Sequence, residues 1–246
     1  MVEEAENTSK TAAPNAAQGA AQSTYALVAA IEAKDPFIRG HSAEVSRIAV
    51  AIAQEMQVPE PTIETLRVAA ILHDVGKISV PGEILNKPGK LSWPEWQLVK
   101  THVAQGLRIL SEANFPAPVK ATVAQHHERL DGSGYPQGLR KEQIMMEARI
   151  LAVADVFEAM TSHRPYRPAA SVAQAVEYIQ GNVGTKFDPA VVEAFLKVLG
   201  EEHEDVTPSS SLTAYTYSHP VNPDEKHARG GTRHVVRRRI LVRRRV

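Results

Sequence analysis

The chain of 246 residues is long enough for one sizeable domain with tails, or for two small domains. Its hydrophobic content of 43% suits a protein with a true core, and the absence of cysteine excludes disulfides, thiolate metal sites and cysteine nucleophiles. The formal net charge of zero conceals an asymmetry: residues 229–246 hold eight arginines and no acidic residue, which leaves 20 basic against 28 acidic residues in 1–228.

The hydrophobic runs are short. None approaches the ~20 apolar residues that a membrane-spanning helix requires. The N-terminus also lacks the basic and then apolar pattern of a signal peptide. We therefore expect a cytoplasmic protein without a transmembrane segment.

Along the chain, hydrophobic periodicity divides a helical body from two tails. Residues 1–22 are rich in small and polar residues and are predicted to be a flexible lead-in, whereas 201–246 are predicted to be a basic, disordered tail. The body, 23–200, is predicted to be all-α. We expect helices over 23–34, 41–56, 62–75, 92–112, 116–127, 142–162, 170–181 and 188–199.

Two helix starts have clear capping signals. Ser92 and Glu95 have the spacing of a capping box at the start of the 92–112 helix. Asp188 suits the N-cap of the last helix, with Pro189 at its first helical position. Between the helices, the long loops 76–91 and 128–141 hold most of the glycine and proline of the body, and loops of that length are often functional.

The histidines of the body are concentrated near predicted helix ends and beside apolar residues. His73 follows Leu66 and Ala70 at helical spacing, which directs it into the core. Asp155 lies within an apolar stretch, where a carboxylate is costly unless a cation compensates it. A single core histidine is usually only hydrogen-bonded, but the whole set favours a divalent cation. Its members are His41, His73, Asp74, His102, His126, His127 and Asp155.

These residues belong to a longer pattern that resembles the HD-GYP family, a branch of the HD-domain phosphohydrolases. The resemblance covers about 35–200 and implies an all-helical fold with two or three metal ions in the core of a helical bundle. It also implies hydrolysis of cyclic di-GMP to linear pGpG, GMP or both. The matching segments are His73-Asp-Val-Gly-Lys77, His102, His126-His-Glu-Arg129, Asp131-Gly-Ser-Gly-Tyr-Pro136, Ala154-Asp155, Arg164-Pro-Tyr-Arg167 and Phe187-Asp-Pro189.

The resemblance implies a division of the metal ligands into two sites. The first metal is expected to take His73, Asp74 and Asp155, with His41 nearby. The second is expected to take His102, His126 and His127, with Asp74 bridging both ions. Nitrogen and oxygen ligands suit iron or manganese, with nickel or zinc as alternatives.

The number of ions depends on one departure from the family pattern. Some relatives have a glutamate four residues before His41 that helps to hold a third metal, and this chain has Phe37 there. Two divalent transition-metal ions are therefore expected. His163 matches no ligand position and is expected near the ligands or at the surface.

The resemblance also implies substrate-binding residues. Lys77 is expected to contact the phosphate as a catalytic residue beside Asp74. Arg164 and Arg167 are expected to hold phosphate or guanine, unless they are ordinary surface arginines. Tyr135, in the Gly-Tyr-Pro loop, is expected to cover the guanine base or to help dock diguanylate cyclase (GGDEF) domains; otherwise the loop only braces the fold.

Two other functions stay open at this point. The domain could hold metals and sense a cyclic dinucleotide without turnover. It could also be an HD phosphohydrolase acting on mononucleotides or other phosphoesters, although the Gly-Tyr-Pro and Arg-Pro-Tyr-Arg segments disfavour this. The arginine tail could contact an anionic surface such as lipid or nucleic acid, or it could simply be a solvated tail.

Overall fold

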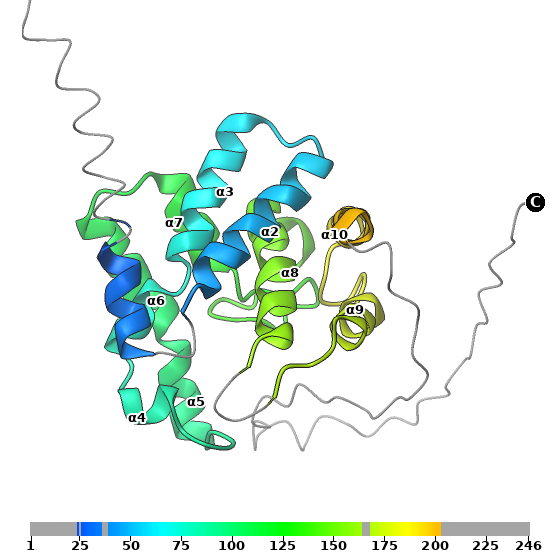
Figure 1. The fold of residues 1–246 in the computed structure, drawn as a ribbon. Coiled ribbons are helices and arrows are strands. Elements are labelled where there is room, and N and C mark those ends of the chain that lie inside the picture. The colour runs from blue at the N-terminus through cyan, green and yellow to red at the C-terminus, as the bar shows by residue number, and fades with distance from the viewer. Residues whose placement is uncertain (1–23, 25, 36–38, 164–167, 203–246) are drawn as a thin grey trace, which may run out of the picture.

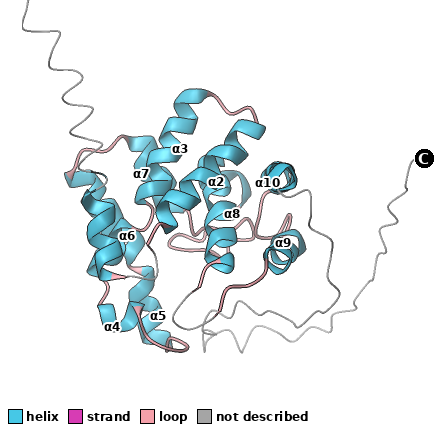
Figure 2. Cartoon of the chain, in the orientation of Figure 1, coloured by secondary structure: helices cyan, strands magenta, loops and turns pink. Residues whose placement is uncertain are grey.

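A computed structural model describes residues 24, 26–35, 39–163 and 168–202 of the chain. Within these residues the secondary structure is helical, with isolated β-bridges but no strand, which confirms the predicted all-α class (Figures 1 and 2). After a first helix over 26–34, the elements are α2 (His41–Glu55), α3 (Glu60–Leu72), η2 (Val75–Ser79), α4 (Gly82–Leu85), α5 (Trp93–Lys100), α6 (His102–Glu112), α7 (Ala117–Gln125), η3 (Lys141–Gln143), α8 (Met146–Thr161), α9 (Val172–Gly181) and α10 (Pro189–Glu202).

The helices pack around α8 and α2. In Figure 1, α2 and α3 lie next to each other, α8 runs behind α2, and α9 and α10 cover the side of α8 away from α6 and α7. The largest apolar cluster joins α2, α8 and α10, and a smaller one joins α3, α6 and α7. None of the helices in the described residues combines the length and apolar character needed to cross a bilayer.

The sequence of α8 explains its central place. Apolar residues occupy all sides of this helix, and Ile150, Leu151 and Val153 are each fully buried. A helix that is apolar all round is stable only when its neighbours cover it. The buried acids Asp155 and Glu158 are therefore exceptions within α8, and they point to a local function.

The capping predictions are confirmed. The Ser92 backbone N–H donates to Glu95 Oε2 at 2.7 Å, which closes one half of the predicted capping box. At the start of α10, Asp188 Oδ1 accepts from the Ala190 backbone N–H at 2.9 Å. Each carboxylate thus satisfies an N–H group that has no partner within its helix.

The predicted single helix over 92–112 is wrong, because the chain breaks at Thr101 into α5 and α6. The Thr101 backbone N–H bonds to Leu98 O, three residues back, at 3.1 Å, and the Thr101 hydroxyl donates to the same carbonyl at 2.7 Å. These bonds replace the regular i−4 pattern. The break makes His102 the first residue of α6.

Two other predicted helix bounds also need correction. The helix predicted over 62–75 ends at Leu72, and the chain then turns into η2. There Gly76 approaches α6 so closely that a Cβ atom would lie 1.8 Å from the His102 carbonyl oxygen. The helix predicted over 142–162 begins at Met146, since η3 precedes it.

Candidate metal centre

Ends of several helices bring the candidate ligands to the middle of α8. His41 is the first residue of α2, and His102 is the first residue of α6. The pair His73-Asp74 follows α3, and the pair His126-His127 follows α7. Asp155 projects from α8 itself. All of these residues are buried except His127, which is partly buried.

The potential ligand atoms form two groups. The carboxylate-rich group consists of His41, His73 and Asp155, together with the nearby Glu158. Its His41 Nε2 lies 3.4 Å from Asp155 Oδ1 and 3.3 Å from His73 Nε2. The imidazole-rich group consists of Asp74, His102, His126 and His127. The ligand atoms of His41, His73 and Asp155 all lie within 4.8 Å of one another. The same holds for those of Asp74, His102, His126 and His127.

Asp74 lies between the two groups. Its Oδ2 is 3.3 Å from His73 Nε2, and its Oδ1 is 3.5 Å from His102 Nε2. One carboxylate thus faces both groups with different oxygens, as the sequence prediction of a bridging aspartate requires. Lys77 Nζ donates to Asp74 Oδ2 at 2.6 Å.

Three imidazoles are oriented by the backbone of their own helix end. The Nδ1 atoms of His73, His102 and His126 bond to the carbonyl oxygens three residues earlier, at 2.7, 2.7 and 2.6 Å. Because a carbonyl only accepts, each Nδ1 must carry the proton. In the neutral ring with this tautomer, Nε2 carries the lone pair, and here each Nε2 faces the centre, the arrangement seen in metal-binding histidines.

The unpaired atoms of the centre fit a divalent cation. Among the described residues, Asp74 Oδ1, His102 Nε2 and His126 Nε2 are buried without a hydrogen-bond partner. Unpaired buried acceptors are rare and costly. Imidazole nitrogens and carboxylate oxygens without sulfur suit divalent transition metals, so these residues fit such an ion.

The pKa shifts of His102, His126 and Asp74 give these residues the protonation states that metal coordination requires. Burial lowers the pKa of His102 to about 4 and that of His126 to about 3, so both imidazoles are neutral at pH 7 and free to coordinate. Burial opposes ionisation of Asp74, but Lys77 and His73 hold its pKa well below the ordinary value. The aspartate is therefore anionic, as a ligand must be.

His41 differs from these histidines. Burial on its own would lower its pKa, but hydrogen bonds with Asp155 and Glu158 raise it to about 9. Its Nδ1 contacts Glu158 Oε2 directly. A proton on His41 neutralises negative charge that a metal ion would otherwise neutralise, so the carboxylate-rich group also suits a cation.

Glu158 is the residue of the centre that the sequence analysis missed. It is buried in α8, and besides His41 it accepts from the Ser162 hydroxyl at 2.7 Å. The available signal was its place three residues after Asp155, on the same face of a helix that is otherwise apolar. A glutamate that orients a histidine ligand through Nδ1 is a common second layer of metal sites.

The Gly-Tyr-Pro loop packs against the imidazole-rich group. Buried Glu128 accepts from the backbone N–H groups of Gln137 and Leu139 at 2.7 and 2.9 Å, which holds the loop in place. A Cβ atom on Gly134 would lie 2.4 Å from the Glu128 Cα atom, so only glycine fits. The Tyr135 ring lies against the His127 ring, with 4.6 Å between their centroids.

Other predicted site residues do not join the centre or cannot be placed. His163 is exposed at the end of α8, in agreement with its predicted surface position. Phe37, Arg164, Arg167 and the arginine tail lie outside the described residues.

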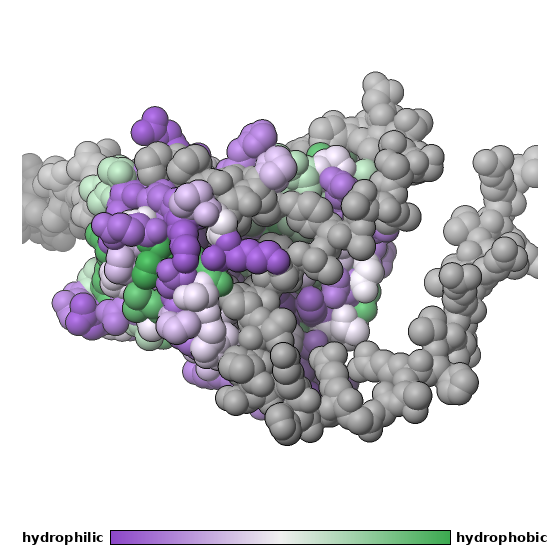
Figure 3. Space-filling model, turned by 90° about the horizontal axis from the view of Figure 1, so that it is seen from below, coloured by the Kyte–Doolittle hydropathy of each residue, from purple (hydrophilic) through white to green (hydrophobic). Residues whose placement is uncertain are grey.

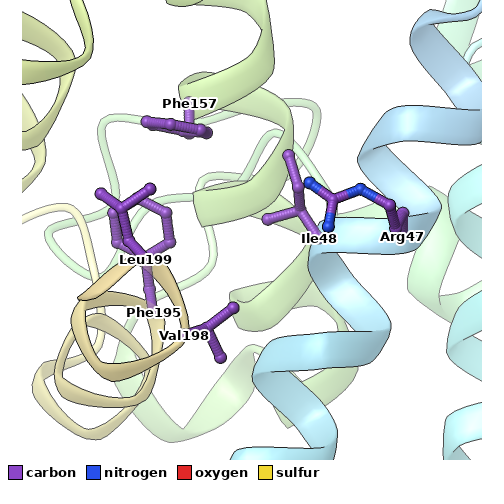
Figure 4. Close-up of a pocket in the computed structure, with 6 residues that line it drawn as sticks. All are labelled: Arg47, Ile48, Phe157, Phe195, Val198 and Leu199. Atoms are coloured by element: carbon purple, nitrogen blue, oxygen red, sulfur yellow. The ribbon is translucent and has the colours of Figure 1, made fainter. Parts of the chain in front are cut away.

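A separate surface depression has no chemistry of this kind. It lies between α2, α8 and α10, where apolar side chains of the three helices gather with a single guanidinium at one side, next to Ile48 (Figure 4). That guanidinium, of Arg47, is paired with Glu44 at 2.8 Å. The depression is lined by Arg47, Ile48, Phe157, Phe195, Val198 and Leu199, and offers no histidine or carboxylate.

Comparisons with known proteins identify a matching family and several relatives. The sequence model of the HD domain matches residues 26–191. The chain is 41% identical over 171 residues to a cyclic di-GMP phosphodiesterase of Pseudomonas aeruginosa, covering 69% of this chain and 41% of that protein. It is 36% identical over 186 residues to 3'3'-cGAMP-specific phosphodiesterase 3 of Vibrio cholerae, covering 74% of this chain and 40% of that protein.

The fold has a counterpart among solved structures. An HDG"Y"P protein from Bdellovibrio bacteriovorus superposes with a TM-score of 0.55 at 23% identity, covering 65% of this chain and 51% of that chain. The present chain spans about two fifths of the length of the two curated relatives.

Proposed function

The chain belongs to the HD-domain family and, within it, to the HD-GYP branch, and from that premise we propose that it is a metal-dependent phosphodiesterase that hydrolyses cyclic di-GMP to linear pGpG, GMP or both. The observation that carries the proposal is the pair of ligand groups that share Asp74. The names of the relatives support a cyclic dinucleotide as the substrate class.

In this proposal two divalent ions, iron or manganese in preference to nickel or zinc, are held by the two groups. The carboxylate-rich group holds one through His41, His73 and Asp155, and the imidazole-rich group holds the other through its three histidines. Asp74 serves both. When bound, such a pair of ions activates water for attack on phosphorus and stabilises the developing charge on oxygen.

The protein side chains position the phosphate and balance its charge. Lys77 is partly exposed above the buried Asp74, so its ammonium can donate to a phosphate oxygen while it stays paired with the carboxylate. Arg164 and Arg167 are proposed to hold the second phosphate or a guanine, as guanidinium groups do. Phe37 favours two ions over three, because it supplies no oxygen.

The test of this function is an assay for linear product. Protein loaded with manganese or iron should convert cyclic di-GMP to pGpG or GMP, and chelation should stop the reaction. Elemental analysis of protein purified without chelator should give about two transition-metal ions per chain. A metal-loaded protein that binds cyclic di-GMP but releases no linear product would contradict the proposal and support a sensor.

We also propose two kinds of partner for this chain. In this proposal the Gly-Tyr-Pro loop docks diguanylate cyclase (GGDEF) domains through its exposed part, which includes Pro136 and Gln137. The arginine tail could contact an anionic surface. A truncation after Gly200 with unchanged liposome co-sedimentation would contradict the tail proposal.

A further inference from the structure

Helix α5 places two tryptophans and a lysine beside the Gly-Tyr-Pro loop. The Trp96 ring meets the Tyr135 ring edge to face, with 5.9 Å between centroids and an interplanar angle of 85°. Tyr135 in turn lies against His127 of the imidazole-rich group. Aromatic side chains thus extend from the metal centre to α5, which lies at the lower end of the molecule in Figure 1. Figure 3 views the molecule from this lower side, where hydrophilic and apolar residues are both at the surface.

Lys100 adds a cation to this aromatic surface. Its Nζ lies 5.4 Å from the Trp93 ring centroid and 5.7 Å from the Tyr135 ring centroid. In the part of the chain that the structure describes, no carboxylate lies within ion-pair distance of it. By contrast, Lys77 is paired with Asp74 and Lys87 with Glu95. The charge of Lys100 is therefore available to a ligand.

The chemistry of this surface matches a purine base. Aromatic side chains stack on bases with about 1–3 kcal/mol per base. Lysine donates to O6 and N7 of guanine, whereas adenine presents an amino donor in place of O6. A cyclic dinucleotide has two bases, so aromatic surface beside the metal centre is placed to bind the base of the half that is not being cleaved.

We propose that Trp96, Lys100 and Tyr135 bind one guanine base of the substrate, with the rings as the stacking surface and the Lys100 ammonium donating to O6 and N7. This inference rests on the proposed function, since it assigns part of the same substrate. It makes Lys100 a specificity-determining residue that favours guanine over adenine. The metal ligands have no part in this preference.

The tryptophans of the chain can serve as fluorescence reporters of ligand binding at this surface. The chain contains two tryptophans, Trp93 and Trp96, and both belong to α5. Intrinsic tryptophan fluorescence therefore reports on this surface alone. In stopped-flow mixing of metal-loaded protein with cyclic di-GMP, we expect a saturable change in fluorescence before turnover, and Trp96→Phe should remove most of it.

Kinetics separate binding of the base from the chemical step. Lys100→Met should raise KM for cyclic di-GMP about tenfold or more and leave kcat within about twofold, because the lost contact does not touch the phosphate. It should also reduce the preference for cyclic di-GMP over cyclic di-AMP in the fluorescence titration. Matched controls are Lys90→Met, an exposed lysine in the preceding loop, and Leu98→Ala, 39% exposed on α5.

The outcomes distinguish this inference from the proposed function. If wild type turns over cyclic di-GMP and Lys100→Met keeps its KM and its guanine preference, the base site is wrong and the phosphodiesterase stands. If wild type hydrolyses no cyclic dinucleotide, the fluorescence titration still decides: a saturable signal weakened by Lys100→Met supports the site, and no signal overturns it. Lys100→Met keeps the test valid even if Trp96→Phe disturbs the fold.

Discussion

The carboxylate-rich and imidazole-rich groups lie side by side, yet the protein satisfies them differently. In the first, His41 is surrounded by carboxylates, so a proton on its ring balances their charge. In the second, neutral His102 and His126 present Nε2 atoms that have no hydrogen-bond partner among the described residues. The first group therefore balances its charge within the protein, whereas the second keeps buried acceptor atoms that a cation would satisfy.

The largest effect should come from removing the residue that joins the groups. Asp74→Asn keeps the size of the side chain but deletes the charge shared by both, so turnover should fall at least ~1,000-fold. Metal content, measured by elemental analysis, should fall with it. Glu64→Gln, which breaks an exposed ion pair with Arg67, is the control and should change neither. An Asp74→Asn protein with both ions and full activity would contradict the bridging role.

Substituting one histidine from each group tests the comparison directly. In metal-free protein, His41→Leu removes the ring that balances the charge of the buried Asp155 and Glu158 carboxylates, which should cost ~3–5 kcal/mol of unfolding free energy. His126→Leu removes an unpaired nitrogen instead, so unfolding free energy should change by only about 1 kcal/mol. Urea unfolding with chelator present measures both values.

Adding manganese should widen the difference in unfolding free energy between wild type and His126→Leu. Wild type should gain about 2.7 kcal/mol at a hundredfold excess over the dissociation constant, and His126→Leu should gain much less because it lacks a ligand. Equal losses for the two metal-free variants would show that the groups do not differ as described.

A smaller effect is expected where η2 meets α6. Gly76→Ala would place a Cβ atom against the His102 carbonyl and push Asp74 away from His102, at a cost of about 3 kcal/mol. Gly181→Ala is the matched control, because a Cβ atom there meets nothing within 4 Å and should be neutral or slightly stabilising. Thermal denaturation compares them, and equal melting temperatures would contradict the close contact.

The smallest effect concerns a charge outside the centre. A hydrogen bond from Lys87 and others from Ser92 lower the pKa of Glu95 to about 2. Because the folded-state pKa is depressed, the charge stabilises the fold above pH ~4.5 and loses this effect as pH falls towards 2. Glu95→Gln keeps the cap but not the charge, so its melting temperature should be lower by only about 2 °C at pH 7, and the difference should vanish in acid. A difference that persisted at low pH would mean that packing, not charge, is involved.

Much of the fold follows from local sequence signals. The helix starts at Ser92 and Asp188 were predictable because capping involves residues only a few positions apart. The break at Thr101 was not, since a threonine inside a helical pattern bonds to solvent or to its own helix with equal ease. The sequence does not reveal that Gly76 packs against the backbone at the start of α6, next to this break.

The candidate metal centre was also predictable only in part. Histidines at the ends of apolar helices predicted the convergence that the structure shows, although their roles as ligands stay a prediction. Glu158 was missed because a single acid in a helix usually faces solvent, and its burial depends on where α2 places His41. Similarly, Trp96 and Lys100 gain meaning only through contact with Tyr135, some 35 residues further on.

The bonds from Nδ1 to the backbone of each helix end have a consequence for the entropy of metal binding. His73, His102 and His126 are already held in one rotamer and one tautomer when the helices form. An incoming ion therefore does not have to immobilise these side chains, each of which would otherwise cost about 0.5–1.5 kcal/mol. The ordering is completed during folding, so we expect the affinity for metal to depend on how well these helix ends persist.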